Sequence, residues 1–296
     1  MSWPAAEVKI DANLVATLLH SQFPNFDGVE CYEVAEGFDN SLWRLGPDLV
    51  IRLPRRELAV TPLENELRWL PEVARHVSLR TPLPLLAGAP SDAFPWPWSI
   101  SSWIDGVPGD EVSPDVLARS ARSLATFLRE VHVGAPPDAP HNPFRSVTLA
   151  ARSSTFEERL NELRHEIDYE KVYSLWLKCC DVPIGDRPAQ WLHGDFHPGN
   201  TLYRDEALIG VVDFGDLCAG DPATDLAGGL MSLPYDALAA FFRAYQLDDE
   251  PTLQRTIGWA VFFGVMMVSL GLRDRPSYLR IGQRALSNAT RLAENS

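Results

Sequence analysis

Three polar side chains in the second half of this chain have the types and spacing of a site for a metal ion and a phosphate chain. Asp195 precedes Asn200 by five residues, and Asp213 follows Asn200 by thirteen. Oxygen ligands suit Mg²⁺, which takes one or two protein groups and completes its shell with phosphate oxygens and water. Asn200 and Asp213 are therefore the predicted metal ligands. Asp195 is predicted to accept the proton of an attacking hydroxyl.

The two segments that carry these residues match a known arrangement. His193-Gly-Asp-Phe-His-Pro-Gly-Asn200 and Val212-Asp-Phe-Gly-Asp216 form the H-x-D-x-x-x-x-N plus D-F-G pattern of kinases. With glycine before the first aspartate, and Gly220-Asp-Pro-Ala-Thr-Asp225 following, the pattern resembles the aminoglycoside phosphotransferase family of small-molecule kinases. The resemblance implies an α+β, two-lobed protein-kinase-like fold. It also implies Mg²⁺-dependent phosphoryl transfer from ATP or GTP to a hydroxyl of a small molecule.

Other polar residues near these motifs have structural interpretations. We interpret His193 as a brace for the catalytic loop, and Asp225 as a group that hydrogen-bonds the backbone of that loop. For His197, a place near the substrate and a packing role both remain open.

The remaining patterns predict two lobes that position the site. Residues 1–104 are expected to form a nucleotide-binding N-lobe with an antiparallel sheet and a helix. Residues 105–296 are expected to form a mainly helical C-lobe with the catalytic loop and the acceptor site. Strands are predicted near residues 28–34, 41–45, 49–53 and 98–104. Helices are predicted after Asp11, near 65–77, after Ser113, over 155–180 in two pieces, and near 235–245, 251–272 and 276–292.

The nucleotide side departs from the usual kinase pattern. The phosphate-covering loop would be Glu36-Gly-Phe-Asp-Asn-Ser41, with a single glycine, and the side chains of Asn40 and Ser41 are expected to donate to phosphate. Arg52 stands where most relatives have lysine, and a guanidinium can contact phosphate oxygens bidentately. Arg55 and Arg56 are interpreted as solvated turn residues.

Two further nucleotide contacts follow from the resemblance. Glu66 is chosen as the helix partner of Arg52, with Glu64 as the alternative. The backbone carbonyl of Ser102 and the amide of Ile104 are expected to face the adenine edge. Backbone contacts do not distinguish ATP from GTP.

Composition and charge limit the possible partners. The chain has 296 residues, of which 46% are hydrophobic and 22% charged, as in ordinary globular proteins. Its net charge of −14 argues against nucleic acid or an anionic membrane as a partner. From Asp105 onward there are 27 acidic and 18 basic residues, which favours a cationic acceptor. Surface solubility is the alternative explanation of this acidity.

Cysteine usage and hydropathy indicate a cytoplasmic setting. The four cysteines show no metal-ligand spacing, and residues 1–4 do not begin a signal peptide. The uncharged run between Arg255 and Arg273 is short for a membrane span, so we expect a buried core helix.

Several acceptors and one non-enzymatic function compete. An aminoglycoside antibiotic fits the acidic C-lobe best, which would imply a role in antibiotic resistance. Macrolides, tuberactinomycins, homoserine and choline-like alcohols remain open. The acidic segment over residues 157–170 either borders an amine-binding cleft or is a solvated helix face. A nucleotide-binding regulator without phosphoryl transfer is the alternative of another class, but such a protein would need no base at Asp195.

Overall fold

The computed structural model describes residues 5–295, and residues 1–4, on which the expected lack of a signal peptide partly rests, lie outside them. The chain divides into two compact units. The N-terminal unit contains the residues up to His76, Arg80–Asp105 and Asp213–Gly215. The C-terminal unit contains Val77–Leu79, Gly106–Val212 and the residues from Asp216 onward.

The N-terminal unit is an antiparallel sheet with the strand order β1-β2-β3-β5-β4. A hairpin joins β2 to β3 with Leu45 paired to Leu49, and its turn contains Gly46 at φ 58°, in the left-handed region. Its position agrees with the strands predicted near residues 41–45 and 49–53, which leave only residues 46–48 between them. The strands are β1 (Cys31–Glu36), β2 (Asn40–Leu45), β3 (Leu49–Pro54), β4 (Pro84–Gly88) and β5 (Trp98–Ser102).

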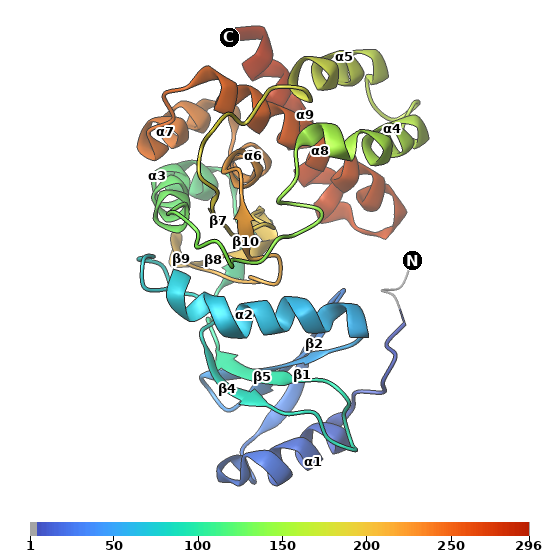
Figure 1. Ribbon diagram of the computed structural model, residues 1–296, viewed down its shortest axis with the longest axis vertical. Helices are drawn as coiled ribbons and strands as arrows, with labels where there is room; N and C mark the ends of the chain where they lie inside the picture. Colours follow the sequence, from blue (N-terminus) through green and yellow to red (C-terminus); the bar gives the residue numbers. More distant parts are fainter. Residues whose placement is uncertain (1–4, 296) are drawn as a thin grey trace. The chain divides into compact units, whose positions relative to one another are not determined.

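Two helices lie on opposite faces of this sheet (Figure 1). They are α1 (Ala12–Gln22) and α2 (Val60–Val73). The predicted cap of the first is confirmed, because the side chain of Asp11 accepts a hydrogen bond from the amide of Leu14 at 3.0 Å. The apolar face of α1 packs on one face of the sheet, in a core formed by Val15, Leu18, Leu19, Trp43, Leu45, Ile51, Leu53, Phe94, Trp98 and Ile100.

Some predicted boundaries in this unit are wrong. The second helix begins at Val60, five residues before the predicted start, and Pro71 lies inside it without ending it. The first strand begins at Cys31, because Gly28 has φ 77° and belongs to the preceding turn.

The C-terminal unit is mainly helical, as the resemblance implies. Its longest helix, α8, has α4, α5, α6 and α9 packed around it (Figure 1). Two small sheets, β10-β7 and β6-β8-β9, carry the catalytic segments. The helices are α3 (Pro114–Val131), α4 (Ser153–Glu162), α5 (Tyr169–Cys179), α6 (Ala223–Ser232), α7 (Tyr235–Tyr245), α8 (Glu250–Asp274) and α9 (Pro276–Asn295). The strands are β6 (Val107–Pro108), β7 (Gln190–Leu192), β8 (Thr201–Arg204), β9 (Ala207–Val211) and β10 (Cys218–Gly220).

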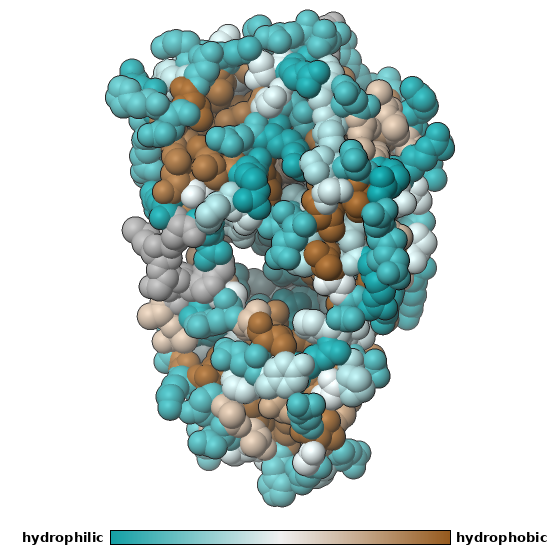
Figure 2. All heavy atoms as spheres, turned by 180° about the vertical axis from the view of Figure 1, so that it is seen from behind, coloured by the Kyte–Doolittle hydropathy of each residue, from teal (hydrophilic) through white to brown (hydrophobic). Residues whose placement is uncertain are grey.

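The apolar helix predicted between Arg255 and Arg273 is the core helix of this unit. Glu250–Arg273 is long and apolar enough to cross a membrane by length and composition, but 78% of its most apolar window is buried inside the protein. A core helix of a globular unit passes the same test. Figure 2 shows one face of the molecule, where polar side chains separate the apolar patches.

A buried ion pair fastens α8 to the segment before α6. Nε of Arg255 lies 2.6 Å from Asp221, and a second nitrogen donates to the carbonyl of Pro183 at 2.8 Å. Both charged side chains are nearly inaccessible, at 4% and 5% exposure.

Arg255→Ala is therefore expected to lower the free energy of unfolding by about 3–5 kcal/mol, because it leaves a buried carboxylate unpaired. Urea denaturation measures this loss. Arg187→Ala is the matched control, since that arginine is 60% exposed beside Asp249, and it should cost less than about 1 kcal/mol. Equal effects of the two substitutions would contradict the structural importance of the buried pair.

Candidate active site

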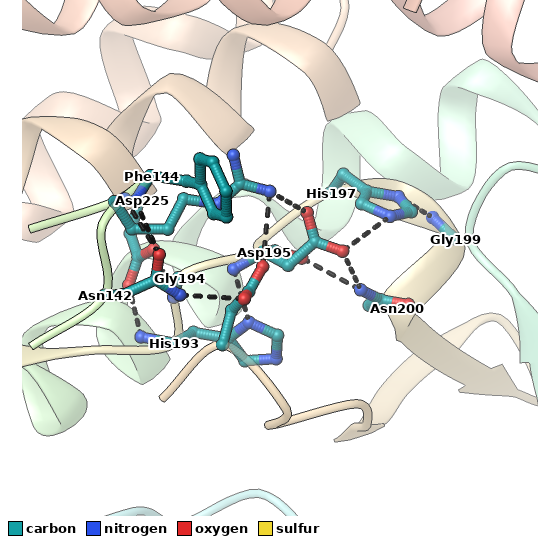
Figure 3. A network of polar contacts seen from close by, with 11 residues as sticks. Asn142, Phe144, His193, Gly194, Asp195, His197, Gly199, Asn200 and Asp225 are labelled. Atoms are coloured by element: carbon teal, nitrogen blue, oxygen red, sulfur yellow. Dashed lines mark hydrogen bonds and ion pairs between the residues drawn. The ribbon is translucent and has the colours of Figure 1, made fainter. Parts of the chain in front are cut away.

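The catalytic loop, residues 193–200, connects β7 to β8 and is braced by His193 (Figure 3). Nε2 of His193 lies 3.0 Å from the carbonyl oxygen of Val212, and Nδ1 accepts a hydrogen bond from the amide of Asp195 at 3.2 Å. The imidazole therefore carries its proton on Nε2. The interpretation of His193 as a brace is confirmed.

Asp225, near the start of α6, holds the same loop through its backbone amides. Its two carboxylate oxygens accept hydrogen bonds from the amides of His193 at 2.6 Å and Gly194 at 2.9 Å. The prediction that Asp225 hydrogen-bonds the backbone of the catalytic loop is therefore confirmed. The carboxylate also lies 3.1 Å from Nε2 of His132, whose Nδ1 is 2.8 Å from the hydroxyl of Tyr245. His132 and Tyr245 thus support the carboxylate of Asp225, and no sequence pattern indicates this role.

Two glycines permit the close approach of the backbone segments around the loop. Gly194 has φ 85°, and a Cβ there would lie 2.2 Å from the carbonyl oxygen of Asp216. A Cβ on Gly228 of α6 would lie 2.1 Å from the carbonyl oxygen of Phe196. Any larger residue at these positions would push the loop out of place.

The carboxylate of Asp195 is held at both oxygens (Figure 3). Oδ1 lies 3.2 Å from a guanidinium nitrogen of Arg145, and Oδ2 lies 3.3 Å from Nδ2 of Asn200 and 3.5 Å from Nε2 of His197. The side chain is still 34% exposed, so a hydroxyl can reach it. His197 thus lies beside the predicted base, which resolves the position that the sequence left open.

These neighbours decide the charge state of Asp195. Burial favours the neutral acid, but His197 and Arg145 outweigh this effect and hold the pKa of Asp195 well below the usual range of an aspartate. The carboxylate is therefore ionised and ready to accept a hydrogen bond from a hydroxyl.

The groups predicted to bind the metal have suitable free atoms. Nδ2 of Asn200 donates to the backbone oxygen of Asp195 at 2.9 Å and to its carboxylate, so the amide oxygen Oδ1 is the atom left for a cation. Asp213 has a carboxylate that is 57% exposed. One amide oxygen and one carboxylate suit Mg²⁺, which keeps several waters and phosphate ligands. Within residues 5–295 there is no cluster of three or more His, Cys, Asp or Glu side chains that could hold a metal.

In the N-terminal unit, Arg52 of β3 is paired with Glu66 of α2. One guanidinium nitrogen lies 2.5 and 2.6 Å from the two carboxylate oxygens, and both side chains are buried. Glu64 is exposed, so the choice between the two glutamates falls to Glu66. A second nitrogen of Arg52 lies 3.7 Å from Asp213. Burial opposes the charge on Arg52, but the two carboxylates outweigh it and raise the pKa of the guanidinium.

The interpretation of Arg55 and Arg56 as solvated residues is wrong. Arg55 is 4% exposed, donates to the carbonyl of Gly37 at 2.8 Å and is paired with Glu36. Arg56 lies 2.7 Å from the carboxylate of Asp39. Both arginines therefore support the loop over residues 36–41, where the usual additional glycines are missing.

Ser41 has hydrogen-bond partners within the sheet. Its hydroxyl donates to Glu33 at 3.3 Å and accepts from Nε1 of Trp43 at 2.8 Å, and its donation to a phosphate stays a prediction. Asn40 begins β2, and its side-chain oxygen is buried without a partner in the described part of the chain. An amide oxygen accepts hydrogen bonds and does not bind a phosphate, so donation from Nδ2 of Asn40 stays a prediction.

The residues predicted to contact adenine, Ser102 and Ile104, lie at the end of β5 and just after it. Ser102 closes β5, and its amide and hydroxyl bond to the carbonyls of Leu83 at 2.9 Å and Thr81 at 3.3 Å. Ile104 follows two residues later with a side chain that is 4% exposed. The carbonyl of Ser102 and the amide of Ile104 stay predicted nucleotide contacts.

The loop between α3 and α4 supplies residues that the sequence analysis missed. Arg145 lies 3.2 Å from Asp195 and 3.3 Å from Asp216, and Asn142 donates to Asp216 at 2.8 Å. The proline-rich composition before Asn142 predicts only a loop, and no motif marks Arg145. Its separation of fifty residues from Asp195 leaves no local signal.

Comparison with known proteins agrees with this geometry. The model of the phosphotransferase enzyme family matches residues 30–259. The chain is 28% identical over 166 residues to viomycin phosphotransferase of Streptomyces vinaceus, an alignment that covers 51% of this chain and 55% of that protein. It is 27% identical over 193 residues to aminoglycoside 3'-phosphotransferase of Escherichia coli, covering 61% of this chain and 67% of that protein.

Solved structures with a similar fold are also phosphotransferases. The GDP complex of wild-type aminoglycoside 2'-phosphotransferase-IIIa superposes with a TM-score of 0.69 at 20% identity, covering 97% of this chain and all (100%) of that chain. That similarity establishes the kinase-like fold. The family match extends over most of the chain and includes Asp195 and Asn200 of the catalytic loop as well as Asp213, so the chain belongs to the phosphotransferase enzyme family.

Proposed function

We propose that this protein transfers the γ-phosphoryl group of ATP or GTP to a hydroxyl of a small molecule. The observation that carries the proposal is the carboxylate of Asp195, which is ionised, part-exposed and fixed at both oxygens within the catalytic loop. A protein that only bound nucleotide would not need a fixed carboxylate at this place.

Asp195 would orient the acceptor and take its proton. The hydroxyl oxygen forms a bond to the γ-phosphorus, the bond from phosphorus to the leaving nucleoside diphosphate breaks, and the hydroxyl proton passes to Asp195. A carboxylate with a lowered pKa is a weak base, so it accepts the proton late. This suits a loose transition state, in which the attacking oxygen gains little charge before the phosphoryl group arrives.

The residues predicted for the nucleotide and its metal ion would bind them as follows. Arg52, held by Glu66, is suited to contact phosphate oxygens, and Asn40 lies at the start of the strand after the loop over residues 36–41. Ser102 and Ile104 would bind the base through their backbone. Asn200 and Asp213 would hold Mg²⁺, which neutralises charge on the phosphates when it is bound.

The acceptor is proposed to be an antibiotic with amine groups, such as an aminoglycoside. Support comes from the excess of acidic residues after Asp105 and from the relatives that act on viomycin and aminoglycosides. Macrolides, homoserine and choline-like alcohols are the alternative acceptors.

A screen of binding and turnover tests the proposal. Thermal shifts are measured with Mg-ATP, Mg-GTP and a panel of aminoglycosides, viomycin, macrolides and amino alcohols, and each hit is then assayed for nucleoside diphosphate release. A stabilising acceptor that is phosphorylated supports the proposed function. Stabilisation by nucleotide, with no turnover on any member of the panel, would favour the nucleotide-binding regulator.

Ionic strength should separate a polycationic acceptor from a neutral one. The Debye length falls from about 10 Å at 0.1 M salt to about 3 Å at 1 M. We therefore expect added salt to raise the apparent KM for the acceptor much more than the KM for nucleotide. Arg145 already neutralises part of the charge of Asp195 and Asp216, so we expect part of the attraction to come from other acidic residues.

The exposed acidic face of α4 is the candidate source of that attraction. Single substitutions Glu157→Gln and Glu158→Gln should weaken the salt dependence if this helix borders the acceptor site. Glu162→Gln should have a smaller effect, because Glu162 is paired with Arg159 at 2.9 Å and with Arg273 at 3.4 Å. Glu206→Gln is the control, because that residue is paired with Arg119 at 2.7 Å on the turn between β8 and β9. An acceptor KM that does not respond to salt would exclude a polycationic substrate and leave phosphoryl transfer in place.

A further inference from the structure

The loop between α3 and α4 is built to deliver one arginine to the catalytic loop. Oδ1 of Asn142 accepts hydrogen bonds from the amides of Phe144 at 2.8 Å and Arg145 at 3.2 Å. The amide of Asn142 in turn donates to the hydroxyl of Ser146 at 3.0 Å. These local bonds fix the turn and therefore the direction in which Arg145 leaves the backbone.

Arg145 joins two carboxylates of the C-terminal unit. Its Nη2 lies 3.2 Å from Oδ1 of Asp195 and 3.3 Å from Oδ2 of Asp216, while Asn142 donates to the other oxygen of Asp216 at 2.8 Å. The guanidinium is only 18% exposed and lies over the ring of Phe263, 5.0 Å from its centroid. An arginine enclosed in this way has little freedom to leave the two carboxylates.

The contact with Arg145 restricts rotation of the Asp195 carboxylate about its Cβ–Cγ bond. Asn200 and His197 contact Oδ2 of Asp195, whereas Arg145 contacts the opposite oxygen. The contacts at Oδ2 are long, at 3.3 and 3.5 Å, and restrain the carboxylate only loosely, so a contact at the opposite oxygen restricts its plane further. Catalysis depends on such alignment, because a misplacement of about 1 Å can cost 10²-fold in rate.

We propose that Arg145 is a positioning residue, which fixes the carboxylate plane of Asp195 and ties it to Asp216 at the end of the Asp213-Phe-Gly-Asp216 segment. The role in turnover rests on the proposed function, because it acts through the base of that reaction. Arg145 touches no reacting atom in this role, and its effect should appear in kcat rather than in nucleotide affinity.

Kinetics of Arg145 variants test this role with the acceptor identified by the screen. Arg145→Ala is expected to lower kcat on the order of 10–100-fold with an unchanged KM for nucleotide, and added guanidinium ion should restore part of the rate. Arg145→Lys keeps the charge but has no planar guanidinium, so its kcat should lie between those of the wild type and Arg145→Ala. Arg187→Ala removes an equally charged side chain from an exposed pair and should leave kcat unchanged.

Asp216→Asn provides a second, independent variant. If the arginine acts by linking the two carboxylates, the losses of kcat in Arg145→Ala and Asp216→Asn should be less than additive in the double variant. An unchanged or higher kcat in folded Arg145→Ala, or fully additive losses, would overturn the proposal. A higher kcat would show that the arginine blocks the base.

Crystal structures of the wild type and Arg145→Ala give a readout that needs no acceptor. The wild type should show Asp195 in one conformer in contact with Arg145, and the variant should show it displaced or in several conformers. An undisturbed Asp195 in the variant would overturn the positioning role. Failure of the wild type to phosphorylate any acceptor would instead reject the proposed function, so the two failures are distinguishable.

Discussion

Asp195→Asn is expected to reduce phosphoryl transfer by about 10²–10⁴-fold, the range of a general-base contribution, while Mg-nucleotide binding stays largely intact. The amide has nearly the same shape but cannot take a proton, and it loses the charge that Arg145 and His197 hold in place. Steady-state kinetics with a verified acceptor and calorimetric titration of Mg-nucleotide measure the two quantities separately.

Asp236→Asn is the matched control for this substitution, because it makes the same chemical change at an exposed position in the first turn of α7. Its turnover should equal that of the wild type. Near-normal turnover of Asp195→Asn would show that the assigned base is wrong.

The pH profile gives a related check on the wild type. Burial alone would favour the neutral acid, yet His197 and Arg145 hold the pKa of Asp195 below its usual range. A group with a lowered pKa keeps its charge as the pH falls. The acid limb of kcat should therefore show no protonation step near about 3.9, the ordinary value for aspartate.

Removal of the charge at position 213 should have the second large effect. Asp213→Asn is expected to weaken Mg-nucleotide binding on the order of 10²-fold, since it removes the one anionic group assigned to the metal, a charge interaction of several kcal/mol. Asn200→Ala should weaken binding less, because a neutral amide contributes no net charge. Calorimetric titration of Mg-nucleotide into each variant measures both effects.

Asparagine is the informative replacement because the backbone of Asp213 is in the left-handed region, at φ 64°. Asparagine tolerates this conformation, whereas alanine adds a steric cost of about 1–2 kcal/mol. The wild type titrated with nucleotide in the presence of a chelator is the control and should match the variant. Unchanged affinity in Asp213→Asn would refute the metal assignment.

Much of the fold could be predicted because its signals are local. The cap at Asp11, the turn at Gly46 and the start of α3 at Ser113 each depend on residues within a few positions. Helix α6, in contrast, was not predicted. All of its residues from Ala223 to Ser232 are buried, so it has no polar face to give a periodic pattern.

Long-range contacts account for the errors around the site. Arg55 and Arg56 look like solvated residues in the sequence, but the fold brings them to the loop over residues 36–41, where they find carboxylates and a carbonyl. The hydroxyl of Ser41 also has a partner that the sequence does not indicate, because it donates to Glu33 on the neighbouring strand. A charged or hydroxyl side chain takes the partner that the fold brings near it, and the sequence does not name that partner.

The sequence by itself determined the class of reaction, phosphoryl transfer. Asp195, Asn200 and Asp213 lie in two short strand-loop segments, and the geometry of such segments depends on neighbouring residues. Only the tertiary structure decided how the base is held and charged. The position and charge of Asp195 depend on Arg145, which is fifty residues away in the chain. The loop between α3 and α4 brings Arg145 to Asp195. Electrostatic effects on a carboxylate fall off within several ångströms in space, whatever the separation along the chain.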